Sequence, residues 1–408
     1  MMIETEYKAA SVVRIMYTTV TACLLYAVSA GLRSNYGILI GAISENSGIH
    51  YSAASFILAI GQLVFGVMQP VFGIVALKKS NRLVLVMGLL LMAMGSALTP
   101  LSKGQLSLLL SLGLALPAGT GAISFGIIMG TITPKLGRQK AAAVSGIVSA
   151  SSGIGSMILS PIIQRVLMQW GLGTTMLVLA IPMLVLIPLS IPISSGGKGG
   201  PGASAEDEIH VLEMIKEALQ NPSYVLITIG FFTCGFHMAI IETHLYSQFV
   251  SYGASERTAA LAFAIYGLAT MLGCIVSGMV STKVKMKWVL SFLYGFRVVL
   301  IGAFLLLPKT ITTIFCFAVL LGVSSAATVT PTSGITEKLF GPAKLATLFG
   351  ICFLVHQMGS FFSAWLGGVC VEVTGGYTMI WMADLLLCVF ACVICTRITE
   401  SSDKWEDQ

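Results

Sequence analysis

The chain has 408 residues, of which 56% are hydrophobic and 10% carry charge, and its formal net charge is +6. Soluble domains carry about 25% charged residues, so this composition excludes a water-soluble globular protein and predicts a chain that lies mostly in a lipid bilayer. The Lys and Arg residues are dispersed over short segments, which excludes a clustered basic surface for nucleic acid.

Twelve apolar stretches are long enough to cross a membrane, which takes about 20 residues. The first half of the chain contains the predicted spans 15–38, 52–76, 83–99, 105–130, 141–166 and 174–193. The second half contains 222–249, 258–281, 288–307, 311–335, 344–370 and 378–397. The first stretch lacks a small-residue cleavage site, so we expect it to be a span and not a removed signal peptide.

The longest polar segment, 194–221, divides the chain into two similar halves. It begins with a Gly-rich run and continues into a candidate helix at 206–220. Shifting the second half back by about 205 positions places Gly278 on Gly73 and Lys283 on Lys78. Such paired repeats are typical of transporters. We therefore expect an N-terminal six-helix bundle at 1–193, a cytoplasmic linker at 194–221 and a C-terminal six-helix bundle at 222–408.

Loop charge predicts the orientation of these spans in the membrane. With the N-terminus inside, 17 Lys and Arg residues fall in the inner segments and three, Lys103, Arg257 and Lys309, in the outer loops. Positive residues gather in cytoplasmic loops. Both termini are therefore predicted to be cytoplasmic, in a multi-pass protein of the cell membrane, and of the inner membrane if the source is bacterial.

Local motifs add a family resemblance that covers essentially the whole chain. They are Gly31-Leu-Arg-Ser-Asn-Tyr-Gly37, Gln69-Pro-Val-Phe-Gly73, Gly153-Ile-Gly155 with Ser160-Pro161, Cys234-Gly-Phe-His237 with Thr243-His244-Leu245, and His356-Gln-Met-Gly359 with Ala364-Trp-Leu-Gly-Gly368. With twelve spans in two halves, the chain resembles the major facilitator superfamily, and within it the bacterial monocarboxylate transporter-like group with its oxalate/formate exchanger relatives. The resemblance implies an all-α membrane fold of two pseudo-symmetric bundles, with spans 1, 4, 7 and 10 lining a central cavity.

The sequence departs from that family at several charged positions. The acidic residue of the loop after span 2 is replaced by Leu77, and its counterpart in the second half reads Thr282. The monocarboxylate group often has an Arg in span 8, and the oxalate exchanger also a Lys in span 11, whereas here span 8 has no charge between Arg257 and Lys283 and span 11 has His356 but no Lys. The inner charge lock of the superfamily and the usual lactate or oxalate site are therefore not secured by these motifs.

Arg33 is the first charged residue in chain order that lies inside a predicted membrane span. A buried charge is expensive and is a functional hypothesis by default, and a guanidinium presents a fork that matches a carboxylate. We therefore expect Arg33, with Tyr36 close by in the same motif, to bind an anionic substrate. The alternative is an Arg that only supports the outer gate.

Span 7 carries three titratable residues, His237, Glu242 and His244. The two His residues are seven apart, so a regular helix places them on one face. His titrates near physiological pH, and we expect these three residues to carry a coupled proton, with His237 also lining the substrate site. The alternatives are neutral His residues bonded to neighbouring helices, and a Glu242 that pairs with Arg33.

Further intramembrane polar residues lie in span 2, where Gln62 and Gln69 are seven apart and are candidates to face the cavity, and in spans 9 to 12. His356 and Gln357 in span 11 are predicted to line the substrate site. Arg297 in span 9 and Asp384 in span 12 are expected to be a structural charge pair, each bonded to the other or to a neighbouring residue. In span 10, Thr328, Thr330, Pro331, Thr332 and Ser333 predict a broken helix. A metal site formed by the three His residues lacks a completing ligand, so no metal is expected.

These observations together predict a secondary active transporter that works by alternating access. The expected substrate is a small organic anion, in the first place a monocarboxylate, moved with a proton. The alternatives are a proton-driven exporter of amphipathic compounds, an anion exchanger, and least of all a non-transporting sensor. No nucleophile–base spacing or phosphate loop indicates an enzyme, no cofactor or nucleic-acid partner is expected, and the protein is expected to be monomeric in the lipid bilayer.

Overall fold

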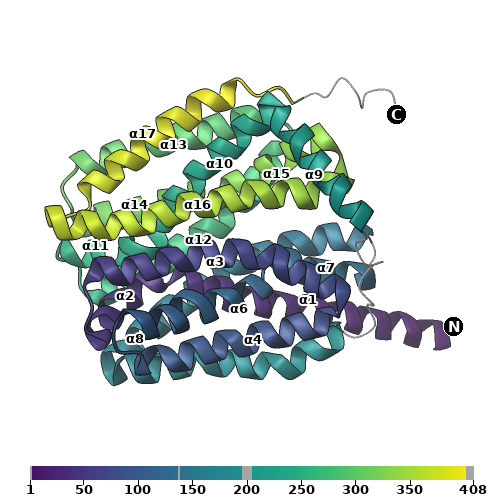
Figure 1. The fold of residues 1–408 in the computed structure, drawn as a ribbon, viewed down its shortest axis with the longest axis horizontal. Helices are drawn as coiled ribbons and strands as arrows, with labels where there is room; N and C mark the ends of the chain where they lie inside the picture. The colour runs from purple at the N-terminus through teal and green to yellow at the C-terminus, as the bar shows by residue number, and fades with distance from the viewer. Residues whose placement is uncertain (1, 137, 195–204, 401–408) are drawn as a thin grey trace.

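The computed structural model describes residues 2–136, 138–194 and 205–400, which are helical almost throughout. Figure 1 shows α1 to α8 in the lower part of the molecule and α10 to α17 in the upper part. Helix α1 begins, and α17 ends, at the same end of the molecule as α9. We call this the terminal end, and the opposite end, where α2 and α11 lie, the distal end.

The first half of the chain forms eight helices and two short irregular turns. Their bounds are α1 (Met2–Ser34), α2 (Tyr36–Ser47), α3 (Tyr51–Lys78), α4 (Asn81–Leu98), the 3₁₀ turn η1 (Thr99–Leu101), α5 (Gln105–Leu108), the π-helix η2 (Leu109–Ala115), α6 (Leu116–Ala122), α7 (Phe125–Leu136) and α8 (Arg138–Ser194). Helix α9 (Ala205–Gln220) then covers the candidate helix of the linker, whose Gly-rich part at 195–204 lies outside the described residues.

The second half repeats this arrangement. Its elements are α10 (Pro222–Ile240), the π-helix η3 (Ile241–Leu245), α11 (Tyr246–Ser251), α12 (Glu256–Ser281), α13 (Met286–Leu306), α14 (Ile311–Ser325), the 3₁₀ turn η4 (Ala326–Thr328), α15 (Val329–Phe340), α16 (Pro342–Thr374) and α17 (Thr378–Thr396).

Eleven helical segments in the described part of the chain are long and apolar enough to cross a membrane. One of them, Val144–Ser194, has 51 residues, whereas a bilayer core of about 30 Å takes about 20. The chain leaves helical geometry at Gly171, with φ 72° and ψ −178°, which glycine adopts without steric penalty. Gly171 therefore separates two crossings, and the described chain has the twelve predicted spans.

Several spans are interrupted near the middle of the membrane, where a regular helix would satisfy its own backbone. Span 1 continues past its predicted end through a break at Asn35 and into α2. Span 7 contains η3, and span 10 breaks at η4, just before the predicted Thr and Pro patch. Such irregular backbone in a membrane is tolerated where it is buried in protein or lines a cavity.

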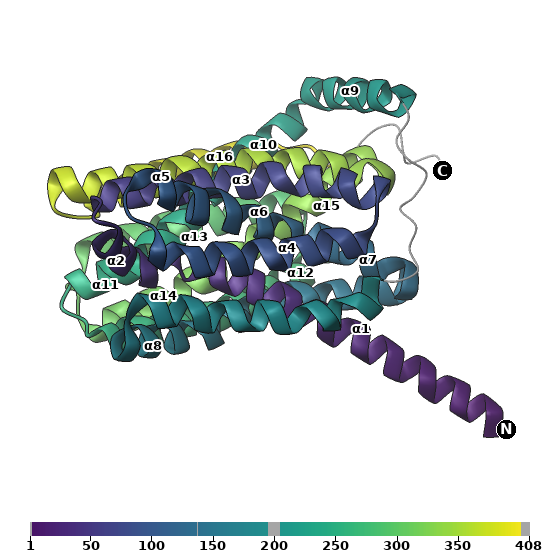
Figure 2. The ribbon, with the colours of Figure 1, turned by 60° about the horizontal axis from the view of Figure 1, so that its bottom comes forward.

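The two halves meet along two helix pairs, α3 with α16 and α8 with α12. Helices α3 and α16 lie side by side in both Figure 1 and Figure 2. Glycine residues allow the helices of each pair to approach closely. A Cβ atom on Gly153 would lie 2.5 Å from the carbonyl oxygen of Gly267, and a Cβ atom on Gly368 would lie 2.5 Å from Ser55. Close contact of this kind is how membrane helices associate without a hydrophobic driving force.

Candidate functional site

Arg33 lies where span 1 is interrupted. It is in the last turn of α1, and the Nδ2 of Asn35 donates to the carbonyl oxygen of Gly31 at 2.6 Å across the break. Because α2 extends the span to Ser47, Arg33 is closer to the middle of the membrane than the predicted boundary at residue 38 suggested. On the α8 side, a Cβ on Gly155 would lie 2.1 Å from the carbonyl oxygen of Ala27, so α1 and α8 cross in close contact below Arg33.

Arg33 contacts residues of both halves. Its Nη1 lies 3.7 Å from Oε2 of Glu242 and donates to Oε1 of Gln62 at 3.3 Å. Its guanidinium carbon lies 4.4 Å above the centre of the Phe65 ring. The side chains of Arg33 and Glu242 are 16% and 4% exposed. The two residues form a nearly buried ion pair between α1 and η3, as expected under the alternative in which Glu242 pairs with Arg33.

Glu242 reaches Arg33 because η3 rests directly on α2. A Cβ on Gly37 would lie 3.0 Å from the carbonyl oxygens of Glu242 and Thr243. Glycine at this position therefore lets the two irregular segments approach each other. Tyr36 is buried beside them, within electrostatic range of Arg33 and Glu242, and its hydroxyl has no hydrogen-bond partner.

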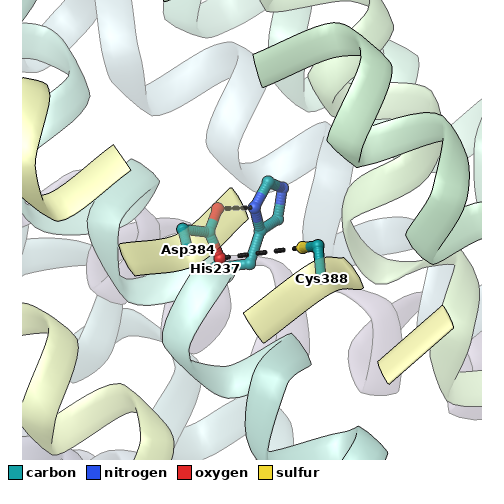
Figure 3. A group of neighbouring side chains, drawn as sticks. All are labelled: His237, Asp384 and Cys388. Atoms are coloured by element: carbon teal, nitrogen blue, oxygen red, sulfur yellow. Dashed lines mark hydrogen bonds and ion pairs between the residues drawn. The ribbon is translucent and has the colours of Figure 1, made fainter. Parts of the chain in front are cut away.

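His237 does not face Arg33, contrary to the expectation that it shares a helix face with His244. Its Nδ1 lies 2.6 Å from Oδ2 of Asp384 on α17, and both side chains are fully buried (Figure 3). The reason is the π-helix η3, which begins after His237, contains His244 and has more residues per turn than an α-helix. Residues seven apart across it no longer share one face.

Arg297 and Asp384 do not bond to each other; of the two expected pairings, the structure shows the one with a neighbour, since Asp384 bonds to His237. Arg297 instead donates from Nη2 to the carbonyl oxygens of Ser324 and Ser325, both at 2.6 Å, and lies over the Tyr294 ring. These are the last carbonyls of α14, which the break at η4 leaves without helical partners. Arg297 therefore satisfies the end of a half-helix and complements its dipole.

His237, Asp384 and Cys388 place three ligand atoms within 4.8 Å of one another, as a metal site would (Figure 3). The group does not fit a metal ion, however. Nδ1 of His237 and Oδ2 of Asp384 already bond to each other, and the permanent charge of Arg297 acts on both Asp384 and Cys388. A cation would have to break that bond beside a guanidinium, so we read the group as a structural polar cluster.

His244 joins the two halves at the distal side of Glu242. Its Nε2 lies 2.8 Å from the carbonyl oxygen of Ala364, so this nitrogen carries the hydrogen, and Nδ1 accepts from the Tyr51 hydroxyl at 3.0 Å. Gly367 leaves room for the ring, since a Cβ there would lie 2.4 Å from it. Both nitrogens of a neutral His244 are thus in use, which leaves none free to take up a proton in this state.

Glu372 makes a second contact across the distal end. Its two carboxylate oxygens accept from the backbone N–H and the hydroxyl of Ser52, at 3.1 and 2.6 Å. Ser52 is in the first turn of α3, where N–H groups have no helical partner and a negative charge is favourable. Glu372 and Tyr51, like Phe65, were not identified from the sequence, because each acquires its role from a partner in the other half or on another helix.

Several side-chain hydrogen bonds, ion pairs and ring contacts join α1–α8 to α10–α17 at the level of Arg33 or towards the distal end. They join Arg33 to Glu242, Tyr51 to His244, Ser52 to Glu372, Phe56 to Phe361 and Trp365, Phe65 to Phe353, Ser160 to Ala260, and Gly37 to Ser247. The halves are therefore joined at the distal end.

His356 and Gln357 lie on α16 near the level of Arg33. They are 4% and 0% exposed, and neither the ring nitrogens of His356 nor the amide atoms of Gln357 have a hydrogen-bond partner. The His356 ring is held between the rings of Phe231 and Phe353, with centroids at 4.6 and 5.2 Å. The structure therefore brings Arg33, Tyr36, Glu242, His356 and Gln357 to one region, and places His237, Arg297 and Asp384 inside the second half.

Comparisons with known proteins agree with this architecture. The family model of the Major Facilitator Superfamily matches residues 22–315 and 247–408. Monocarboxylate transporter 12 of Mus musculus is 24% identical over 84% of this chain and 76% of its own length. The uncharacterized MFS-type transporter YcxA of Bacillus subtilis is 27% identical over 59% of this chain and 60% of its own length. The crystal structure of a D-xylose-proton symporter superimposes with a TM-score of 0.73 at 13% identity, covering 96% of this chain and 98% of that one. The predicted all-α fold of twelve spans is thus confirmed, and the chain belongs to the Major Facilitator Superfamily.

Proposed function

We propose that this transporter moves a small organic anion, in the first place a monocarboxylate, together with a proton. The observation that carries the proposal is the ion pair of Arg33 with Glu242, which joins the two halves and is almost buried. The names of two similar proteins support this proposal. A relative in sequence is named a monocarboxylate transporter, and a protein of similar fold is named a proton symporter. The protein would translocate its substrate without altering it chemically, and thus would not be an enzyme.

In this mechanism the substrate carboxylate replaces Glu242 as the partner of Arg33 once Glu242 has taken up a proton. Glu242 is the group that takes up the proton, on a carboxylate oxygen, and its pair with Arg33 is then neutralised. Arg33 becomes free to bind the substrate carboxylate through its fork of N–H donors. Because the pair links α1 to η3, its state also biases how the two halves sit against each other, which is what coupling requires. Tyr36, His356 and Gln357 would complete the substrate site.

The proposed membrane arrangement follows from loop charge. With both termini in the cytoplasm, the distal end faces outwards, and the two bundles at 1–193 and 222–408 would rock about the central site as a monomer. Contacts at the distal end then correspond to a closed outer gate, held by His244 with Tyr51 and by Glu372 with Ser52. His237, which bonds to Asp384, would support the second bundle and not carry the coupled proton.

The direct test is uptake of labelled lactate, pyruvate, formate and oxalate into proteoliposomes, with and without an inward proton gradient. We expect gradient-driven uptake of at least one monocarboxylate by wild type, and its loss in Arg33→Ala. Arg165→Ala is the matched control, because Arg165 is an exposed residue of α8. Uptake driven only by an anion inside the vesicle would indicate exchange instead, and undiminished uptake by Arg33→Ala would refute the site.

A further inference from the structure

His356 and Gln357 are adjacent residues of α16, and all the polar atoms of their side chains are buried without a hydrogen-bond partner among the described residues. Ser360, one turn along α16, donates to the carbonyl oxygen of Gly235 at 3.0 Å, whereas His237 is hydrogen-bonded through Nδ1 and His244 through both ring nitrogens. Buried polar groups in native proteins are nearly always satisfied, and leaving one unsatisfied is unfavourable. The imidazole of His356 and the amide of Gln357 are within reach of each other but form no hydrogen bond to the rest of the described protein, which points to a ligand that satisfies them.

A continuous apolar wall leads from Arg33 to these two residues. The Arg33 guanidinium lies over the Phe65 ring, the Phe65 ring meets the Phe353 ring edge-on at 6.0 Å, and the Phe353 ring is stacked on His356 with an angle of 8° between their planes. Two phenyl rings thus stand in series between the cation and the imidazole. A two-carbon or three-carbon acid has no apolar body to cover this wall, whereas a ring would stack on it.

The charged residues near His356 and Gln357 indicate which chemical group the ligand carries at the end opposite its carboxylate. His356 is within electrostatic range of Arg33, which repels an ammonium group. Among the described residues, the carboxylate of this region is that of Glu242, which is already bound to Arg33. A neutral imidazole and an amide offer both donors and acceptors but no negative charge. They suit a neutral hydroxyl or amide and disfavour an amino acid.

We propose that the transported anion is a ring-sized carboxylate with a neutral hydrogen-bonding group, such as a hydroxyl, at the end opposite its carboxylate, and that His356 and Gln357 bind this group. The proposal rests on the proposed function, because Arg33 holds the carboxylate in both. It narrows the substrate class from any small monocarboxylate to hydroxyaryl carboxylates and molecules of the same shape.

The test compares two acids that differ by one hydroxyl, 3-phenylpropanoate and 3-(4-hydroxyphenyl)propanoate. Their KM values for proton-driven uptake are measured in proteoliposomes with wild type, Gln357→Leu and His356→Phe. We expect wild type to favour the hydroxylated acid about tenfold, the effect of one good hydrogen bond, and each variant to lose most of that preference. The ratio of two substrates on one preparation is independent of how much protein has folded.

Gln164→Leu is the control, because it makes the same change at a buried residue of α8 whose amide bonds to Met168. It should keep the wild-type ratio. Equal KM values for the two acids in wild type, or a preference that survives in Gln357→Leu, would overturn the inference while uptake that depends on Arg33 leaves the proposed function standing. If neither ring acid nor any shorter carboxylate is transported, the proposed function fails and this inference fails with it.

Discussion

Glu242→Gln is the substitution that most sharply separates binding from coupling. Two unit charges about 3.7 Å apart interact by on the order of 4 kcal/mol at an effective dielectric constant of about 20. Arg33 is 16% exposed and shares its Nη1 with Gln62, which reduces the net benefit. We therefore expect deprotonated Glu242, which competes with the substrate for Arg33, to weaken anion binding by about 1.4 to 2.8 kcal/mol. This corresponds to a tenfold to hundredfold lower affinity for the anion.

The size of the effect of Glu242→Gln on anion affinity depends on pH. In wild type, rising pH removes the proton from Glu242, which recaptures Arg33 and weakens anion binding. Glu242→Gln cannot lose a proton there, so its affinity for the anion should be nearly independent of pH. The variant should therefore bind up to a hundredfold more tightly than wild type at high pH and about equally at low pH.

The assay is anion binding to purified protein by isothermal titration calorimetry at pH values from 5 to 9, with Glu45→Gln as control, since Glu45 is exposed on α2. Proton-driven accumulation in proteoliposomes should disappear in Glu242→Gln, while exchange of internal for external anion continues. A variant that keeps the wild-type pH dependence of binding, or that binds more weakly at high pH, would refute this reasoning.

Three further predictions concern packing, buried charge and the distal gate. Gly155→Ala should yield little folded protein by size-exclusion chromatography, because its Cβ meets the backbone of Ala27, whereas Gly126→Ala on α7 meets nothing and should be tolerated; equal yields would contradict the packing. Asp384→Ala should lower stability by about 3 to 5 kcal/mol, because it leaves the fully buried His237 without its partner and removes the negative charge that acts on buried Arg297; an unchanged melting temperature in detergent would show that the cluster is dispensable. Glu372→Gln should weaken the contact with Ser52 and speed maleimide labelling of a cysteine introduced by Ser247→Cys, which lies between the halves; an unchanged labelling rate would argue against a gate.

The sequence allowed the spans to be predicted because hydropathy reports directly on the bilayer. The break in span 10 was also predictable, since Pro331 cannot continue a regular helix. The alternative pairing of Arg33 with Glu242 followed from charge alone. These features depend on local composition, or on the rule that a buried charge needs a partner.

The orientation of side chains around span 7 could not be predicted in the same way. A heptad spacing placed His237 beside His244, but η3 shifts the register between them, and no residue type in Ile241–Leu245 marks a π-helix. Once His237 turns towards α17 it takes Asp384, and Arg297 is left to cap α14. One change in backbone hydrogen bonding therefore altered three assignments.

Proton uptake on substrate binding tests most directly whether Glu242 takes up a proton when the anion replaces it as the partner of Arg33. Purified wild-type protein in weakly buffered detergent solution is mixed with the transported anion, and the pH change is recorded. The mechanism predicts close to one proton taken up per anion bound when Glu242 starts deprotonated, and none in Glu242→Gln. Anion binding without proton uptake in wild type, or equal uptake by the variant, would contradict it.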